Sequence, residues 1–478
     1  MIAGLDDLGV ASLRHAYDAG LPAATLADAV LDRLRALEDG VRQTVFLDLV
    51  PDDVLLAEAE RLDALAADHR RRGLALPPLF GVPVGVKGNI DVAGLATTAA
   101  CPAFAPCPAA RDAEAVHRLR AAGALVVATT NLDQFATGLV GHRSPYGTPP
   151  NPWHPDTIPG GSSSGSGAAV ALGLVSVALG TDTAGSGRVP GALTATVGVK
   201  PSRGLVSTRG VLPACRSLDC VSVHASSVAD GAAVLAAIAG FDDDDPWSRD
   251  LPLPPPRPGA WHPRGLRIAV PTAASVERLC DSFVAAGFAA AVDALARLGV
   301  VIVPHDPAPL LDAGDLLYDG PWVAERWAGL EGFVSAQPDA VHPVTLRVLS
   351  SGAGPSAAEA FRGRHRLQEL RAQVRRWWRD ADLLLTPTVP TTFTRAEVDA
   401  DPLATNARMG RWTTFTNLLD LAAVAVPAGV LAAPGWPNGR PLGVQVIGPA
   451  GSDAALAAAA SGLEGILGSP TAFPLELP

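Results

Sequence analysis

Segments with the periodicity of helices and strands alternate along this chain, and that alternation limits the fold more than any other feature. Apolar residues recur at three- and four-residue spacing in 11–19, 24–37 and 52–69, which predicts three helices. Short apolar runs, such as 124–129 and 175–179, are typical of buried strands. Alternation of this kind favours an α/β fold, in which helices cover both faces of a sheet.

The chain divides into a helical N-terminal segment and one large unit. We expect the segment to cover residues 1–75 and the compact unit to cover 76–478. Within that unit, the Asp- and Pro-rich segment 242–263 predicts an exposed connection. A strand is predicted at 79–84, followed by a loop that holds Lys87. We expect further helices at 112–122, 283–298, 315–334 and 357–381, and further strands at 266–271, 300–303, 383–386 and 423–426. Gly320-Pro321 could interrupt the helix at 315–334.

Composition restricts the class of function. The net charge is −11 and no basic patch carries interleaved aromatics, so we expect no nucleic-acid partner. No run reaches the roughly 18–20 apolar residues of a membrane span. Asp6 and Asp7 stand where a signal peptide would carry basic and then apolar residues. Five cysteines without a C-x-x-C spacing predict reduced thiols in a cytoplasmic protein. They form no ligand cluster for zinc, so we expect neither a metal nor another cofactor.

Only two of the 37 basic residues are lysines, Lys87 and Lys200. An arginine stays protonated in a protein, whereas burial can lower the pKa of a lysine enough for it to act as a base. A lysine kept in so arginine-rich a chain is therefore a candidate for catalysis. The alternative for either residue is packing of its aliphatic stem.

Two glycine- and serine-rich loops flank one predicted helix–strand unit. The first, Pro159–Gly167, reads PGGSSSGSG; it lacks the ending of a phosphate-binding loop and, unlike a linker, opens directly into an apolar helix. The second, Thr181–Gly187, joins a strand to a helix. Its small residues allow tight backbone angles, and its amides can point beside the Ser186 hydroxyl, as an oxyanion hole requires. The alternative for Ser186 is a helix N-cap.

Lys87, Ser162 and Ser186 lie in long motifs that resemble those of the amidase signature family. The motifs are GVPVGVKGNIDVAG (81–94), PGGSSSGSGAAVALGLVSVALGTDTAGSGRVPG (159–191) and GVKPSRGLVSTRGVLP (198–213). The resemblance implies the fold of that family, a large mixed β-sheet covered by helices on both faces, with an N-terminal helical layer. It also implies amide hydrolysis by a Ser–Ser–Lys triad.

The resemblance assigns roles residue by residue. Ser186 matches the nucleophile, Ser162 the bridging serine and Lys87 the base. A neutral lysine can take the proton of a serine hydroxyl through a second hydroxyl, so the implied chemistry is sound. For Lys200 we expect a structural ion pair or carbonyl contact. The amides that match the oxyanion hole are those of Thr183, Ala184, Gly185 and Ser186.

Segments that lie largely outside the general motifs resemble the allophanate hydrolase subfamily. The resemblance implies that the substrate is an anionic ureido carboxylate bound by Tyr318 and Arg326, with Gln134 as a further candidate contact. A guanidinium can hold a carboxylate through two hydrogen bonds. Tyr318 and Arg326 share a face if one helix runs unbroken through Pro321. The segments are NIDVAGLATTAACPAFA (89–105), TNLDQFATGLVGHRSPYGTPPNP (130–152), VLPACRSLDCVSV (211–223), LLYDGPWVAERW (316–327) and RAEVDADPLATNARMGRWTTFTNLLDLAAVAVPAG (395–429).

Three features depart from the subfamily pattern. Gly88 follows Lys87 where many relatives have Asp, and His142 stands close to the expected site where a small hydroxyl residue is commoner. Many allophanate hydrolases also carry a second domain that processes the first product. This chain ends soon after the amidase motifs, so we expect either a one-domain member or that step left to spontaneous decarboxylation or to another protein. Relatives imply a homodimer.

Other functions stay open at the level of sequence. One is an amidase for another small amide, of the biuret or malonamide type, and a substrate without a carboxylate would not need Arg326. Another is an ammonia-supplying component of an amidotransferase, which requires a glutamine pocket and a large partner surface. A third is a non-catalytic scaffold, although the presence of all three triad residues argues against it.

Overall fold

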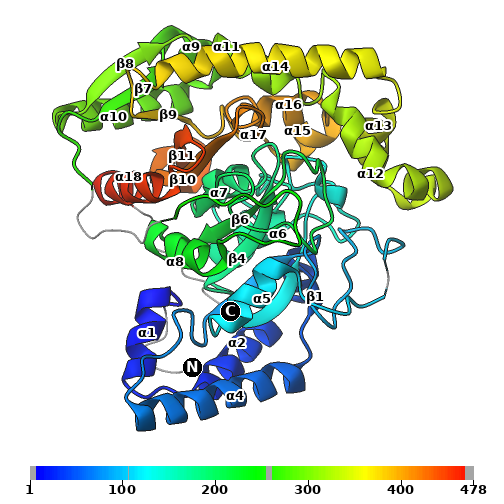
Figure 1. Cartoon of the computed structure of the whole chain (residues 1–478), viewed down its shortest axis with the longest axis vertical. Helices are drawn as coiled ribbons and strands as arrows, with labels where there is room; N and C mark the ends of the chain where they lie inside the picture. Colours follow the sequence, from blue (N-terminus) through cyan, green and yellow to red (C-terminus); the bar gives the residue numbers. More distant parts are fainter. Residues whose placement is uncertain (1–6, 106, 254–260, 469–478) are drawn as a thin grey trace.

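The computed structural model describes residues 7–105, 107–253 and 261–468. These residues form one mixed eleven-stranded sheet surrounded by helices, an α/β fold (Figure 1). The strand order is β1-β3-β2-β4-β6-β5-β10-β11-β9-β7-β8, which confirms the expected fold class. The strands are β1 (Phe46–Leu49), β2 (Pro83–Lys87), β3 (Leu125–Thr130), β4 (Val177–Asp182), β5 (Val197–Lys200), β6 (Cys220–Ala225), β7 (Arg267–Pro271), β8 (Val301–His305), β9 (Leu383–Pro387), β10 (Leu421–Ala433) and β11 (Trp436–Pro449).

The sheet contains two groups of parallel strands, and the strands between these groups are antiparallel. Strand β2 is parallel to its neighbours β3 and β4, and β7 is parallel to β8 and β9. The strands between these groups pair antiparallel. Because the carboxyl ends of parallel strands meet at one edge, residues at or just after the ends of β2 and β4 come together.

Helices cover both faces of the sheet. Gly198 of β5 faces α7, because a Cβ on it would lie 3.1 Å from the Cα of Arg188. Its strand neighbours Val197 and Val199 face α8, because a Cβ on Gly231 would contact both of their side chains. Successive residues of a strand point to opposite faces, so α7 and α8 lie on opposite sides of the sheet.

Several predicted helices match the structure to within a few residues, among them α2, α4, α10 and α14. The helices are α1 (Val10–Asp18), α2 (Ala23–Ala36), α3 (Asp39–Val45), α4 (Asp52–Arg72), α5 (Glu114–Ala121), α6 (Ser164–Ala171), α7 (Arg188–Thr194), α8 (Val228–Ile238), α9 (Ala273–Leu279), α10 (Ser282–Arg297), α11 (Ala308–Asp315), α12 (Trp322–Ala336), α13 (Pro343–Ser351), α14 (Ala357–Trp377), α15 (Arg395–Ala400), α16 (Ala404–Met409), α17 (Phe415–Leu418) and α18 (Asp453–Leu467). Short 3₁₀ turns, η1 and η2, lie at Gln134–Ala136 and Pro338–Ala340. In the described part of the chain, no helix combines the length and the apolar composition needed to cross a bilayer.

The N-terminal helical layer is present, with α1, α2 and α4 gathered at one end of the molecule (Figure 1). The same segment also contributes β1, which pairs antiparallel with β3 at the sheet edge. The sequence did not predict this four-residue strand, because so short a segment carries too little alternation. A domain boundary between residues 75 and 76 stays a prediction.

The structure corrects three local predictions. Lys87 is the last residue of β2 and not part of a loop, because the strand begins later than residue 79. The segment 315–334 is helical only from Trp322, where α12 begins, because α11 ends at Asp315 and a turn with Gly320 and Pro321, the break that the sequence allowed, lies between the two helices. In the segment 242–263, Asp242 and Asp245 are buried instead of exposed, because their carboxylates accept hydrogen bonds from residues 207–209. The central part of that segment lies outside the described residues.

Candidate active site

Lys87 lies at the carboxyl end of β2, beside the carboxyl end of β4, and its ammonium contacts two hydroxyl groups. Its Nζ donates to the Oγ of Ser162 at 2.8 Å and to the Oγ1 of Thr181 at 2.7 Å. Thr181 belongs to β4, and Ser162 lies in the loop before α6. All three side chains are buried. The structure therefore brings two of the three predicted triad residues into direct contact.

Burial lowers the pKa of Lys87 from its usual range to about 7. The carboxylates of Asp133, Asp219 and Asp182 act in the opposite direction, and the Arg326 guanidinium lowers the pKa further. A lysine with a pKa near neutrality is partly unprotonated at physiological pH, so it can accept a proton from a hydroxyl group.

The loop that carries Ser162 is held by Asp133 and by a close approach of backbones. The peptide bond between Gly161 and Ser162 is cis. The Ser162 carbonyl accepts from the Asp133 amide at 3.0 Å, and the Gly161 amide donates to the Leu139 carbonyl at 2.9 Å. A Cβ on Gly161 would lie 2.1 Å from the Asp133 carboxylate and 2.5 Å from the amide nitrogen of Gly141. Only glycine fits at this position.

Ser186 lies in the turn between β4 and α7, and a buried ion pair shapes that turn. The Asp182 carboxylate accepts from the amides of Gly185 and Gly187 at 2.9 and 3.1 Å. It also accepts from Nε and Nη2 of Arg188 at 2.9 and 3.0 Å. Burial works to raise the pKa of Asp182, but the Arg188 guanidinium outweighs it and holds the pKa below its usual value. Asp182 therefore stays ionised and fixes the turn.

The two serine loops meet through the backbone, because the Ser163 amide donates to the Ser186 carbonyl at 3.3 Å. Ser186 is 3% exposed. Within the described ranges, its hydroxyl makes no hydrogen bond, so the link from Ser162 to Ser186 is not closed in this structure. Hydrogen bonds between catalytic groups are often long in unliganded enzymes and shorten when substrate binds.

The structure corrects one member of the predicted oxyanion hole. The Gly185 amide donates to Asp182, so it is not free to bind a substrate oxygen. The amides of Thr183, Ala184 and Ser186 have no acceptor among the residues that the structure describes. The Thr183 hydroxyl donates to Asp219, whose carboxylate also accepts from the amide of Ala214. Burial raises the pKa of Asp219 to about 6.

Arg326 and Tyr318 lie side by side although no single helix joins them. The guanidinium carbon of Arg326 is 5.4 Å from the centroid of the Tyr318 ring. Tyr318 lies in the turn after α11, whereas Arg326 lies in α12 and is 2% exposed. Arg326 donates from Nη1 to the Thr137 hydroxyl at 3.3 Å, and its Nε has no partner among the described residues. A buried guanidinium with an unused N–H can still bind an anionic group.

Gln134 does not match the role predicted for it. Its side-chain amide donates to the carbonyls of Ala100 and Ala340, and its Oε1 accepts from the amide of His342 at 2.7 Å. These bonds use the polar atoms of the side chain to join distant loops. Gln134 therefore supports the structure and is not free to contact a ureido group.

His142, the histidine expected close to the site, is engaged with other residues. Its Nε2 lies 3.0 Å from the Asp399 carboxylate, and its Nδ1 contacts the Thr148 hydroxyl. His142 is partly exposed and bonds to none of the predicted triad residues. Its contacts indicate a role in joining two loops.

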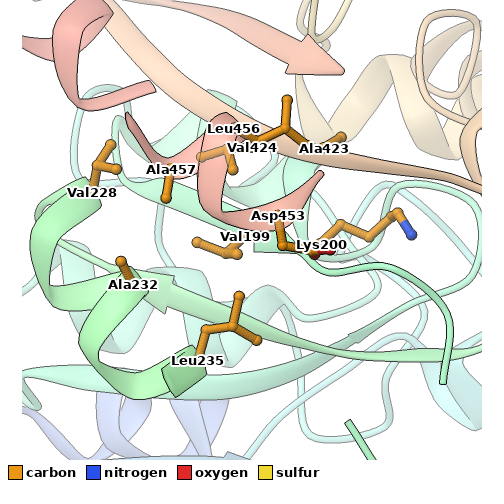
Figure 2. Close-up of a pocket in the computed structure, with 10 residues that line it drawn as sticks. All are labelled: Val199, Lys200, Val228, Ala232, Leu235, Ala423, Val424, Asp453, Leu456 and Ala457. Atoms are coloured by element: carbon orange, nitrogen blue, oxygen red, sulfur yellow. The ribbon is translucent and has the colours of Figure 1, made fainter. Parts of the chain in front are cut away.

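Lys200 forms the carbonyl contact expected of it. Its Nζ donates to the carbonyl of Pro201 at 2.7 Å and lies 3.5 Å from the Cys220 sulfur. Figure 2 shows the side chain leaving a small pocket, with its ammonium pointing away from Val228 and Ala232. The second lysine is structural.

A cavity of about 440 Å³ opens beside Tyr318. The cavity is lined by residues from the loop before Tyr146, from α11 and α13, and from the region around α16. Its charged and aromatic lining residues are Arg143, Asp315, Tyr318, Asp319, Arg347 and Arg411.

The sequence did not single out four residues that organise the site: Thr181, Asp182, Asp133 and Asp219. Thr181 and Asp182 stand inside the glycine-rich motif, so their place next to Ser186 was a usable signal. Asp133 and Asp219 lie far from the serines in sequence. Only the tertiary structure brings the Asp133 carboxylate against Gly161, next to Ser162, and the Asp219 carboxylate to the Thr183 hydroxyl.

Comparison with known proteins identifies the class. Residues 28–457 match the Amidase family, and the chain belongs to that family. Among solved structures, it is similar to an allophanate hydrolase of Kluyveromyces lactis, with a TM-score of 0.88 and 35% identity. That match covers 98% of this chain and 75% of the other chain.

Curated relatives of two kinds are similar in sequence. A urea amidolyase of Lachancea kluyveri is 44% identical over 382 residues, which are 79% of this chain. This chain covers only 20% of that much longer protein. One of the subunits of a glutamyl-tRNA(Gln) amidotransferase from Synechococcus sp. strain RCC307 is 34% identical over 449 residues, which are 88% of this chain and 90% of the relative.

Proposed function

We propose that the protein hydrolyses the terminal amide of allophanate with a triad of Lys87, Ser162 and Ser186. The observation that carries the triad is the buried Lys87, whose ammonium donates to Ser162 and whose pKa is about 7. The similarity to an allophanate hydrolase structure supports the choice of substrate. Other small amides, of the biuret or malonamide type, are the alternative substrates.

The proposed reaction begins with proton removal from Ser186. Neutral Lys87 accepts a proton through Ser162, and the Ser186 oxygen attacks the terminal amide carbon. The amides of Thr183, Ala184 and Ser186 stabilise the negative charge that develops on the carbonyl oxygen. Ser162 returns the proton to the departing nitrogen, which leaves as ammonia. Water then attacks the acyl-enzyme and releases N-carboxycarbamate, which loses carbon dioxide.

The proposed substrate contact is a guanidinium–carboxylate pair at Arg326. Arg326 is buried, and its Nε lacks an acceptor among the described residues. A buried unpaired cation is costly, so a substrate carboxylate at this position would satisfy a group that the protein leaves open. The Tyr318 ring lies against the same guanidinium and would complete the contact.

The relatives also include amidotransferase subunits, so the experiment must separate the two activities. Ammonia release from allophanate, biuret, malonamate, urea and glutamine should be fastest by far for allophanate. Ser186→Ala should abolish the release while its circular dichroism spectrum stays that of the wild type. Preferential release from glutamine would replace the proposal with an ammonia-supplying role. We further propose that the protein is a cytoplasmic homodimer, and size measurements in solution would test the dimer.

A further inference from the structure

A second buried guanidinium lies beside the first. Arg143 is 2% exposed and bonds to the same residue as Arg326, with its Nη1 donating to the Thr137 carbonyl at 3.0 Å. Its Nη2 donates to the Pro402 carbonyl at 2.7 Å. The Nε–H of Arg143 has no acceptor within the described ranges. Two neighbouring arginines thus each keep an unused donor.

No carboxylate in the described part of the chain forms an ion pair with Arg143. Asp133, whose carboxylate acts electrostatically on Arg143, uses its two oxygens to accept from the amides of Gly141 and of Arg143 itself. Burial lowers the pKa of the Arg143 guanidinium, but an arginine remains protonated in a protein. Carbonyl contacts share its charge without neutralising it, and an unpaired buried charge is costly to maintain. An anion from outside the chain would supply the missing partner.

Arg143 lines the cavity beside Tyr318, so an anion in the cavity would lie next to its almost fully buried guanidinium. Arg347 of α13 is exposed at the same cavity. A third arginine there, Arg411, is paired with Asp315 at 2.6 Å, and Asp319 is the other acidic group in the lining. The unpaired arginines therefore give the cavity a local positive charge in a chain whose net charge is −11.

We infer that this cavity is a binding site for small carboxylate anions, in which Arg143 binds the carboxylate and Arg347 attracts it at the rim. Arg326 does not line the cavity, whereas Tyr318 lines it and also packs against Arg326, so the cavity adjoins the proposed substrate contact. That the cavity holds the anionic substrate or the dicarboxylate product on its way to or from the reaction centre rests on the proposed function. The inference that the cavity binds anions does not depend on that function.

Malonate, a dicarboxylate that the triad cannot hydrolyse, tests the binding. Its affinity is measured by isothermal titration calorimetry in an Arg326→Gln background, which removes the cation proposed for the reaction centre. Malonate should still bind in this background. Adding Arg143→Gln should weaken the affinity at least about tenfold, the loss expected when a buried charge pair loses one partner. Unchanged affinity after Arg143→Gln, or no binding once Arg326 is replaced, would overturn the inference.

A second variant guards against misfolding, since Arg143 also joins two loops. Arg347→Gln changes an exposed side chain. It should lower the affinity for malonate about two- to fivefold at low salt, and this loss should vanish at high salt. Arg297→Gln removes an exposed charge on α10, outside the cavity lining, and should leave the affinity for malonate unchanged. Equal effects of these two variants would mean that only net charge matters, and would reject the site.

Kinetics on allophanate identify the anion that uses the cavity. If the cavity collects substrate, Arg347→Gln lowers kcat/KM and leaves kcat unchanged. If the cavity holds product, Arg347→Gln instead changes kcat and the inhibition constant of malonate. A protein that binds malonate through Arg143 but does not hydrolyse allophanate would refute the proposed function and leave the binding site standing.

Discussion

Lys87 donates a hydrogen bond of 2.8 Å to Ser162, a residue 75 positions later in the chain. The pair forms because β2 ends beside β4, and the loop before α6 returns to the same edge of the sheet. Burial at this edge brings the pKa of the lysine to about 7. The contact therefore joins a group that can accept a proton to a hydroxyl that can pass one on.

Replacing Lys87 with arginine should be nearly as damaging as replacing it with alanine. Arginine keeps the positive charge but cannot act as a base at neutral pH. We expect kcat to fall by about 10²–10⁴-fold in both variants, the range for loss of a general base. Ammonia release at saturating substrate measures this. An arginine variant that retains more than about a tenth of the rate would make Lys87 a structural cation.

Activity should fall as the pH drops below about 7. The base form of Lys87 is neutral, and burial lowers its pKa to about 7, so protonation below that pH removes the base. The acid limb of log kcat/KM should decrease about tenfold per pH unit. An ordinary lysine would place that limb near pH ~10.4, so a limb at such high pH would contradict the assigned role.

Asp219→Asn should move the acid limb to lower pH. The Asp219 carboxylate raises the pKa of Lys87, so its removal leaves the effect of burial less opposed. The asparagine oxygen can still accept from the Thr183 hydroxyl, but its NH2 group replaces the oxygen that accepts from the Ala214 amide, so the circular dichroism spectrum must first be shown to match that of the wild type. Asp293→Asn, at an exposed position on α10, is the matched control. The pH profile of kcat/KM tests the prediction, and a limb that stays in place would exclude an electrostatic action of Asp219 on Lys87.

Arg326→Ala should lower kcat/KM for allophanate by about two orders of magnitude or more. Loss of one partner of a buried charge pair costs roughly 2–5 kcal/mol, and about 1.4 kcal/mol corresponds to a factor of ten. A neutral amide of similar size should be affected far less, because it has no carboxylate to leave unpaired. Arg326→Lys should recover only part of the loss. Equal losses on both substrates would show that Arg326 supports the structure alone.

Gly161→Ala should impair both stability and activity. The added Cβ would lie 2.1 Å from the Asp133 carboxylate and 2.5 Å from a backbone nitrogen, so the loop that carries Ser162 must move. Overpacking of this kind costs about 1–3 kcal/mol. Gly332→Ala provides the control, because nothing lies within 4 Å of a Cβ there. Thermal unfolding and ammonia release measure the two effects, and wild-type values for both would contradict the tight packing of this loop.

Most of the fold and the candidate triad could be predicted from the sequence for a local reason. Helical and strand periodicity lies within short segments, and so do the glycine- and serine-rich motifs around Ser162 and Ser186. The rarity of lysine singled out Lys87 in the same way. Errors arose where a short element had little local signal, as at β1, whereas the break at Gly320 and Pro321 had a local signal in those two residues.

The tertiary structure alone decided which polar groups are already occupied. Gln134 bonds to a residue 208 positions away, and the Gly185 amide is taken by the Asp182 carboxylate, so neither is available to a substrate. Conversely, Arg143 and Arg326 are left with unused donors among the described residues, and Arg143 lines a cavity. Sequence determines which donors and acceptors exist and where the chain turns. Their pairing depends on contacts between distant segments, because buried groups must find partners wherever packing places them.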